Sequence, residues 1–298
     1  MLIGILAVVN FCLFSQDDSE PGKKFEVEVS VGMGELKPDS IYQRITGPDT
    51  LILQYASFYQ LNHTSSGTEG EFKSLIPFNL SAHYLLGGDE FKFYLKAGVD
   101  YGAKSITSAK AYQVSWPDFN ESHDYGFTDK ISYLVPHLGI GIRYSAFDFY
   151  GALGLGSASY KHTEEYNYSE PGFSYDTSYD FELKGTAPAV IFGIKYRIPL
   201  KIGKTKLHAF LKLESMLLKI SSLTGSKKTR GSSSNGQSFN ETTDGTLYTF
   251  QWNPYRNEWF DYWDVFTSPD SGSNNLMRNF VEPGLELSGF RIMIGIGF

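Results

Sequence analysis

The residues that could carry out catalysis do not form a recognised motif anywhere in the sequence. His63-Thr-Ser65 has a His-x-Ser spacing, and His208 shares a predicted strand with Glu214. A nucleophile and its base must lie within hydrogen-bond reach of each other, whereas six strand residues separate His208 from Glu214 by roughly 20 Å. The sequence has a single cysteine and contains neither HExxH nor GxSxG. We therefore expect no catalysis and no bound metal or cofactor.

Ionisable residues recur instead at every second position of alternating segments. In the segment 90–103, Lys92, Lys96 and Asp100 alternate with large apolar residues such as Phe93 and Leu95. This period-2 alternation predicts strands that have one polar and one apolar face. Buried charges need partners, so the polar faces predict a network of ion pairs. Its predicted members are Glu26, Glu28, Lys92, Lys96, Asp100, Arg143, Asp148, Lys195, Arg197, Lys206, Lys212, Glu214 and Arg291.

Eight segments have this alternation and must position the charges. They are 24–36, 72–86, 90–103, 130–144, 148–160, 186–198, 205–220 and 284–298. The 298 residues include 20 Tyr, 23 Phe and 30 Gly, a composition that also favours strands and turns. The sequence predicts an all-β chain folded as a closed, antiparallel, up-and-down barrel of eight strands. Residues 41–61 could add a hairpin, which would make ten strands.

Long and short connections alternate between these segments. The predicted connections 37–71, 104–129, 161–185 and 221–283 are long, and the others are short. This alternation places the long loops at one end of a barrel and both termini at the other. The long loops are acidic and aromatic, and the last contains Trp252, Tyr255, Trp259, Tyr262 and Trp263. Such residues suit a binding surface, but they equally suit packing of the loops on one another.

The N-terminal residues have the features of a targeting segment. The run from Leu2 to Phe14 is apolar but too short to cross a bilayer, and Ser15 follows it. We predict that residues 1–15 are a cleaved secretory signal and that 16–298 form one barrel domain. Cys12 lies within this signal, so the mature chain is expected to need no disulfide.

The last segment indicates which face of the predicted barrel is apolar. Its large apolar residues alternate up to the final position, at Phe290, Ile292, Ile294, Ile296 and Phe298. The alternation of polar and apolar residues by itself also fits a soluble, lipocalin-like barrel with an apolar interior. The terminal aromatic residue and the long loops favour an apolar face turned toward lipid. An eight-stranded barrel is just wide enough to be filled by side chains, and the charges would then fill it.

This last segment resembles the closing strand of gram-negative outer-membrane β-barrel proteins. The architecture resembles the small OmpA-like and OmpW-like barrels. The resemblance implies a place in the cell outer membrane, contact with its lipid and lipopolysaccharide, and insertion by the barrel assembly machinery. Phe290, Ile292, Ile294, Ile296 and Phe298 would then form the assembly signal.

The resemblance further implies a monomer with a structural or surface-binding role, whose extracellular ligand the sequence does not identify. One alternative is a narrow, porin-like channel for small or hydrophobic solutes. A lipid A-modifying enzyme is the less favoured alternative, because no nucleophile–base pair is present. The formal net charge of −7 gives no support to nucleic-acid binding.

Overall fold

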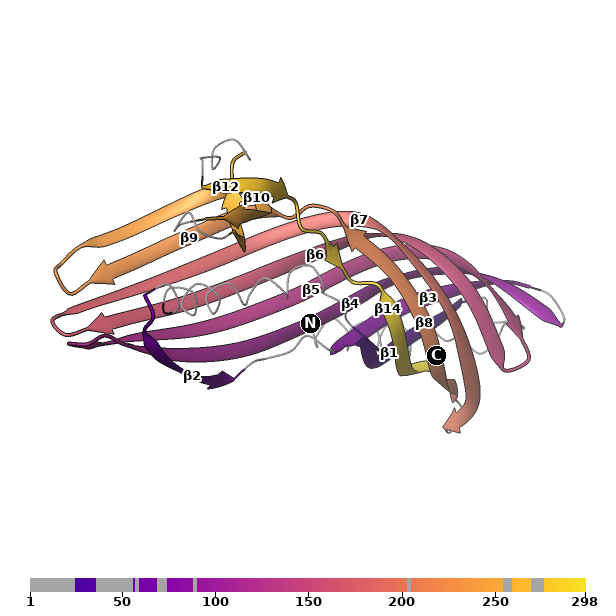
Figure 1. Ribbon diagram of the computed structural model, residues 1–298. Helices are drawn as coiled ribbons and strands as arrows, with labels where there is room; N and C mark the ends of the chain where they lie inside the picture. The colour runs from indigo at the N-terminus through magenta and orange to yellow at the C-terminus, as the bar shows by residue number, and fades with distance from the viewer. Residues whose placement is uncertain are drawn as a thin grey trace.

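The computed structural model describes residues 25–35, 56, 59–68, 74–87, 90–202, 205–253, 259–268 and 276–298. These residues form one antiparallel sheet, which confirms the predicted all-β class (Figure 1). The predicted signal, 1–15, lies outside the described residues, as does most of 41–61. The strands are β1 (Phe25–Glu35), β2 (Asn62–Thr68), β3 (Ser74–Gly87), β4 (Phe91–Ser115), β5 (Asn120–Tyr144), β6 (Phe147–Glu170), β7 (Phe173–Ile202), β8 (Thr205–Ile220), β9 (Thr224–Ser233), β10 (Ser238–Trp252), β11 (Phe260–Phe266), β12 (Met277–Val281), β13 (Leu285–Glu286) and β14 (Gly289–Gly297).

Eight strands pair with one another in a ring. The order is β1, β3, β4, β5, β6, β7, β8 and β14, and β14 pairs with β1 to complete it. In this last pairing Val29 lies opposite Ile296 and Val31 lies opposite Ile294. Each of the eight segments with predicted alternation supplies one strand of the ring.

The predicted loops 104–129, 161–185 and 221–283 are wrong, because strands occupy most of them. β4 and β5 continue beyond the ring, and β6 and β7 do so until Pro171 and Gly172 form a tight turn. Gly172 has a φ of 85°, in the left-handed region that glycine adopts without strain. Residues 221–283 contain β9 to β12, and β2 lies within the predicted loop 37–71.

The additional strands form a curved sheet that projects from one end of the ring, as Figure 1 shows for the long hairpins. Its order is β2, β4, β5, β6, β7, β9, β10 and then β11. We call this sheet the extension; it comprises 62–68, 104–131, 157–186, 224–252, 260–266 and 277–281. The turn at Ser145 and Ala146 and both described ends of the chain, Phe25 and Phe298, lie at the other end of the ring.

Glycines let large aromatic side chains fit inside the ring. Tyr94 lies opposite Gly141, and Tyr150 lies opposite Gly193 on the neighbouring strand. A Cβ atom at Gly141 would lie 2.2 Å from the Tyr94 ring, and one at Gly193 would lie 2.2 Å from the Tyr150 hydroxyl. Only glycine permits so close an approach between a ring and the adjacent backbone.

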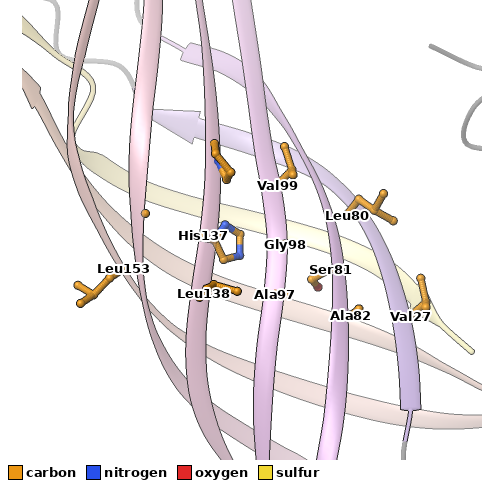
Figure 2. Close-up of a pocket in the computed structure, with 12 residues that line it drawn as sticks. Val27, Leu80, Ser81, Ala82, Ala97, Gly98, Val99, His137, Leu138 and Leu153 are labelled. Atoms are coloured by element: carbon orange, nitrogen blue, oxygen red, sulfur yellow. The ribbon is translucent and has the colours of Figure 1, made fainter.

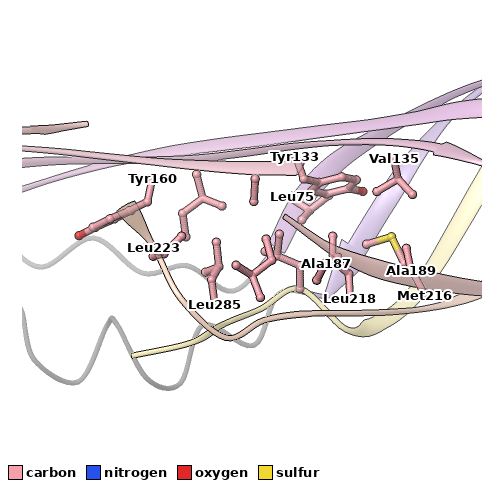
Figure 3. Packing of buried hydrophobic residues seen from close by; sticks show 14 of the residues in the cluster. Leu75, Tyr133, Val135, Tyr160, Ala187, Ala189, Met216, Leu218, Leu223 and Leu285 are labelled. Carbon is pink, nitrogen blue, oxygen red and sulfur yellow. The ribbon is translucent and has the colours of Figure 1, made fainter. Parts of the chain in front are cut away.

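The part of the ring interior nearest the extension is apolar. Tyr133, Val135, Ala189, Met216 and Leu218 pack there in a buried cluster (Figure 3). Full burial of a side chain such as Leu218 stabilises a fold by roughly 1.5–3 kcal/mol. The expectation of a charged face along the whole interior is therefore wrong, since these residues share the inward parity with His137 and Glu214.

Candidate functional site

The charged site lies inside the ring, in the half nearer to the chain ends. Ion pairs link all but two of the predicted members, and most of these side chains are buried. Lys92 is exposed at the start of β4, and the side chain of Lys206 is not described. The linked residues are Glu26, Glu28, Lys96, Asp100, Arg143, Asp148, Lys195, Arg197, Lys212, Glu214 and Arg291.

One group of ion pairs is centred on Arg143. Its guanidinium donates two hydrogen bonds to Glu26, at 3.0 and 2.7 Å, and its Nε donates to Asp148 at 2.8 Å. The Nζ atom of Lys195 lies 2.8 Å from Asp148 and also donates to Glu28. Bidentate guanidinium–carboxylate pairs have the most specific geometry of all ion pairs. These contacts join β1, β5, β6 and β7 across the interior.

A second group is centred on Glu214, one layer closer to the extension. Arg291 donates to Glu214 at 3.0 Å and to Asp100 at 3.2 Å. Lys212 lies 3.2 Å and Lys96 lies 3.7 Å from the same Glu214 carboxylate. The Tyr150 hydroxyl also donates to Glu214, at 2.6 Å. The carboxylate is thus surrounded by donors from four strands.

Tyrosine hydroxyls belong to this network although the sequence reasoning did not include them. Besides Tyr150, Tyr133 accepts a hydrogen bond from Arg291 at 3.3 Å. Only residues with charged side chains were predicted as members of the network. Its inward parity, together with an inward glycine on the facing strand, is the sequence signal that could have identified these positions.

Glu26, Glu28 and His208 have ligand atoms within 4.8 Å of one another, the only such group among the described residues that could hold a metal ion. The same carboxylates, however, are already paired with Arg143 and Lys195. A divalent cation there would be repelled by those two positive charges. The chemistry of this cluster therefore favours ion pairing and hydrogen bonding, including the 3.1 Å contact from His208 Nε2 to Glu28.

The outward face of the ring carries an apolar belt with a sharp limit. On β6 the outward side chains are Phe147, Phe149, Leu153 and Leu155, and then the face becomes polar with Lys161 and its neighbours. Leu138 and Ile140 on β5 are 71% and 69% exposed. The other strands of the ring have the same exposed apolar positions, including Phe290, Ile292, Ile294 and Ile296 of the predicted assembly signal.

Aromatic side chains mark the end of the belt away from the extension. Phe91 stacks on Tyr144 with a centroid distance of 4.8 Å, and Phe147 lies 5.1 Å from Tyr196. Phe298, the last predicted member of the assembly signal, is half-buried at this end. Its backbone N–H donates to the carbonyl of Val27 at 2.9 Å, which ties the C-terminus to β1.

The pairing of β5 with β6 is interrupted within the belt. It runs to Leu134 opposite Ser157 and resumes at His137 opposite Gly154, so that it skips Val135 and Pro136. Proline has no N–H to donate to the ladder. A groove of about 650 Å³ crosses the outer face beside this gap, and Figure 2 shows Leu138 and Leu153 projecting from its walls. Its lining is almost entirely apolar.

Most of the aromatic residues that were predicted to lie in the last loop lie in strands of the extension, where they pack against other aromatic residues. Trp252 is in β10, and Tyr262 and Trp263 are in β11. Trp252 lies 5.6 Å from Tyr262, and Trp263 packs on Phe181 of β7 at 4.5 Å. Trp259 precedes β11 and stacks against the Arg278 guanidinium at 3.8 Å, whereas Tyr255 lies outside the described residues.

His162 lies at the centre of this aromatic packing. Its Nδ1 lies 2.7 Å from Asp129, its Nε2 lies 3.7 Å from Glu164, and its ring meets the edge of Trp263 at 4.9 Å. Burial disfavours protonation, but the hydrogen bond to Asp129 and the negative charges of Asp129 and Glu164 outweigh it and raise the pKa of His162 to about 9. The imidazolium is therefore the form present at neutral pH.

Alkaline pH is expected to loosen the contact between β11 and the rest of the extension. Because the folded pKa of His162 exceeds its unfolded value, its stabilisation is complete below about pH 6.5 and is lost as pH rises through 9. The loss amounts to about 3 kcal/mol. Tryptophan fluorescence of the wild type and a His162→Gln variant between pH 6 and 10 would measure it. A transition of equal size in the variant would contradict this assignment.

Sequence comparisons identify no relatives, since no known family model and no curated protein matches the chain. Among solved structures, the fold is similar to the crystal structure of the outer membrane protein OprG from Pseudomonas aeruginosa. The two share 13% sequence identity, and the match covers 93% of this chain and 96% of that chain with a TM-score of 0.31. Within the described residues, no helix is long and apolar enough to span a membrane.

Proposed function

We propose that this protein is an integral outer-membrane β-barrel whose extension forms a binding surface outside the cell. The observation that carries the proposal is the apolar belt around a ring whose interior contains buried ion pairs. In water, side chains such as Leu138 and Leu153 would expose an apolar surface well beyond the few hundred Å² usual for soluble monomers. In a membrane the same apolar surface would contact lipid chains instead of water, and the ion pairs inside the ring would be separated from the hydrocarbon by the strands.

The dimensions of the belt agree with this location. On β6 the outward apolar residues run from Phe147 to Leu155, close to the ~9–11 residues that a tilted strand needs to cross hydrocarbon. The aromatic pairs at one end correspond to the interfacial girdle of such barrels. This orientation places the extension at the cell surface among lipopolysaccharide, with both described chain ends on the periplasmic side. Phe290 to Phe298 would serve as the signal for the assembly machinery.

The contents of the ring favour a structural or binding role over bulk transport. The ion-pair groups fill one half of the interior and the apolar cluster fills the other. An ion would have to break the buried pairs and then cross an apolar layer, and both steps are costly. The extension, in contrast, presents strands that extend well beyond the belt.

Membrane fractionation combined with gel mobility tests the location. We expect the protein in the outer-membrane fraction, with a folded form whose mobility changes on boiling. A protein recovered from the periplasm without detergent would overturn the proposal.

Deletion of 224–281 tests the role of the extension, since it removes β9 to β12 and leaves the ring strands in place. Binding of cells or surface partners should be lost while heat-modifiable mobility remains. Unchanged binding would remove the surface-binding role and leave the membrane location intact.

A second candidate function is a conduit for small apolar solutes. The gap at Pro136 lies next to Val135 of the buried apolar cluster and beside the apolar groove on the outer face. A route opened there would lead to the apolar cluster rather than through the two groups of ion pairs. Uptake of an apolar dye by proteoliposomes, compared between wild type and Pro136→Ala, would test it, because alanine restores the missing N–H. Equal uptake by both proteins and by empty vesicles would exclude the conduit.

A further inference from the structure

The outward face of the extension carries a regular array of polar side chains on four neighbouring strands. Residues directly opposite one another form a first row across β6, β7, β9 and β10, consisting of Glu165, Ser178, Arg230 and Asn240. A second row, next to the first, contains Asn167, Asp176 and Ser232. Adjacent strands lie ~4.8 Å apart, so the first row spans about 14 Å and the second about 10 Å.

A shallow groove lies along these rows. Its volume is about 570 Å³, within the range of small-molecule sites. The two central strands contribute the short hydroxyl side chains Ser178 and Ser232 and the bare backbone of Gly231, whereas Glu165 and Asn240 stand at the two sides. The Arg230 guanidinium is turned toward Asp180, with an Nη2–Oδ2 distance of 3.3 Å. Short side chains thus line the floor of the groove between Glu165 and Asn240.

The side chains that line the groove can form hydrogen bonds with a ligand that is rich in hydroxyl groups. Carboxylates accept hydrogen bonds, the guanidinium donates them, and amides and hydroxyls do both. Glu165, Asp176 and Arg230 together carry one net negative charge, so the groove disfavours an anionic ligand such as a phosphorylated sugar. Phe239 is the only large apolar side chain among the lining residues, whereas a peptide interface usually needs several such anchors. Sugar hydroxyls both donate and accept hydrogen bonds, so they can pair with all of these groups.

We propose that this groove binds a neutral oligosaccharide. The inference rests on the proposed function only for the position of the groove outside the cell, where surface glycans lie beside the outer wall of the extension. The ligand could come from the lipopolysaccharide of the same membrane or from a glycan outside the cell. In both cases the sugar lies along the rows and exchanges hydrogen bonds with Asp176 and Asn240.

The test uses the folded full chain in an amine-oxide detergent, because sugar-based detergents would compete for the groove. Calorimetric titration with maltoheptaose represents an external neutral glycan, and titration with dephosphorylated core oligosaccharide represents the membrane's own. We expect saturable binding of at least one probe. Asp176→Ala should weaken it about tenfold or more, because the substitution removes a hydrogen bond to a charged group. Ser232→Trp should abolish it by filling the floor.

Asp244→Ala is the matched control, because Asp244 lies on the same face of β10 but outside the groove. It should bind as the wild type does. The proposal is overturned if neither sugar binds, if a lysine-rich peptide binds in their place, or if Asp176→Ala and Ser232→Trp bind normally. Heat-modifiable mobility of the same samples reports on the barrel, so loss of sugar binding with normal mobility rejects the groove alone.

Discussion

Gly141→Val is expected to prevent the ring from closing normally. The nearest Tyr94 ring atom would lie 2.2 Å from the new Cβ, and the buried tyrosine ring is stacked on His83. Overpacking of this kind costs about 3 kcal/mol or more, because the ring must leave its rotamer or the strands must separate. Gel mobility after refolding into detergent would measure the loss as a missing folded band.

Two further variants make the Gly141 prediction specific. Gly126→Val alters the same strand, but its Cβ would meet only Glu165, at 3.9 Å, so it should fold normally. Combining Gly141→Val with Tyr94→Ala should restore much of the folded band by removing the clash. Normal folding of Gly141→Val alone would show that Tyr94 does not occupy the ring interior as described.

Glu214→Ala is expected to destabilise the protein by about 3–5 kcal/mol, the usual cost of removing one partner from a buried ion pair. Lys212 and Lys96 would then lose their ion-pair partner, because both pair with Glu214. Arg291 would keep only its ion pair with Asp100. Guanidinium unfolding in lipid vesicles, followed by tryptophan fluorescence, would give the change in the free energy of unfolding.

Glu182→Ala provides the comparison for Glu214, because Glu182 pairs with Lys161 on the exposed face of the extension. Exposed pairs contribute little, so this change should stay within about 1 kcal/mol. Equal effects of the two substitutions would mean that the Glu214 carboxylate is solvated, and the interior network would have to be abandoned.

The ring strands could be predicted from the sequence because their two faces differ so strongly. On β4, Phe93 and Leu95 face outward while Lys96 and Asp100 face inward. The extension could not be predicted in this way, since its outward residues, such as Lys161 and Glu165, are polar. The same backbone continues, but the apolar alternation that reveals a strand disappears at the end of the belt.

The members of the ion-pair network could be selected by parity, but their partners could not. Lys195 and Glu28 are 167 residues apart and meet only because the ring brings β1 and β7 to face each other across its interior. The apolar layer was also missed, because Val135 and Leu218 were assigned the character of their charged neighbours on the same face. The alternation predicts whether a residue faces into or out of the ring, but not how far along the axis of the ring it lies.

Single-cysteine labelling along β6 tests the central claim most directly. Phe149, Leu153, Lys161 and Glu165 share the outward face of this strand, two within the belt and two beyond it. The predicted mature chain has no cysteine, so each introduced thiol would be unique. In intact cells, a membrane-impermeant maleimide should label Lys161→Cys and Glu165→Cys, and should leave Phe149→Cys and Leu153→Cys unlabelled until detergent is added. Labelling of all four positions before detergent would contradict a membrane around the belt.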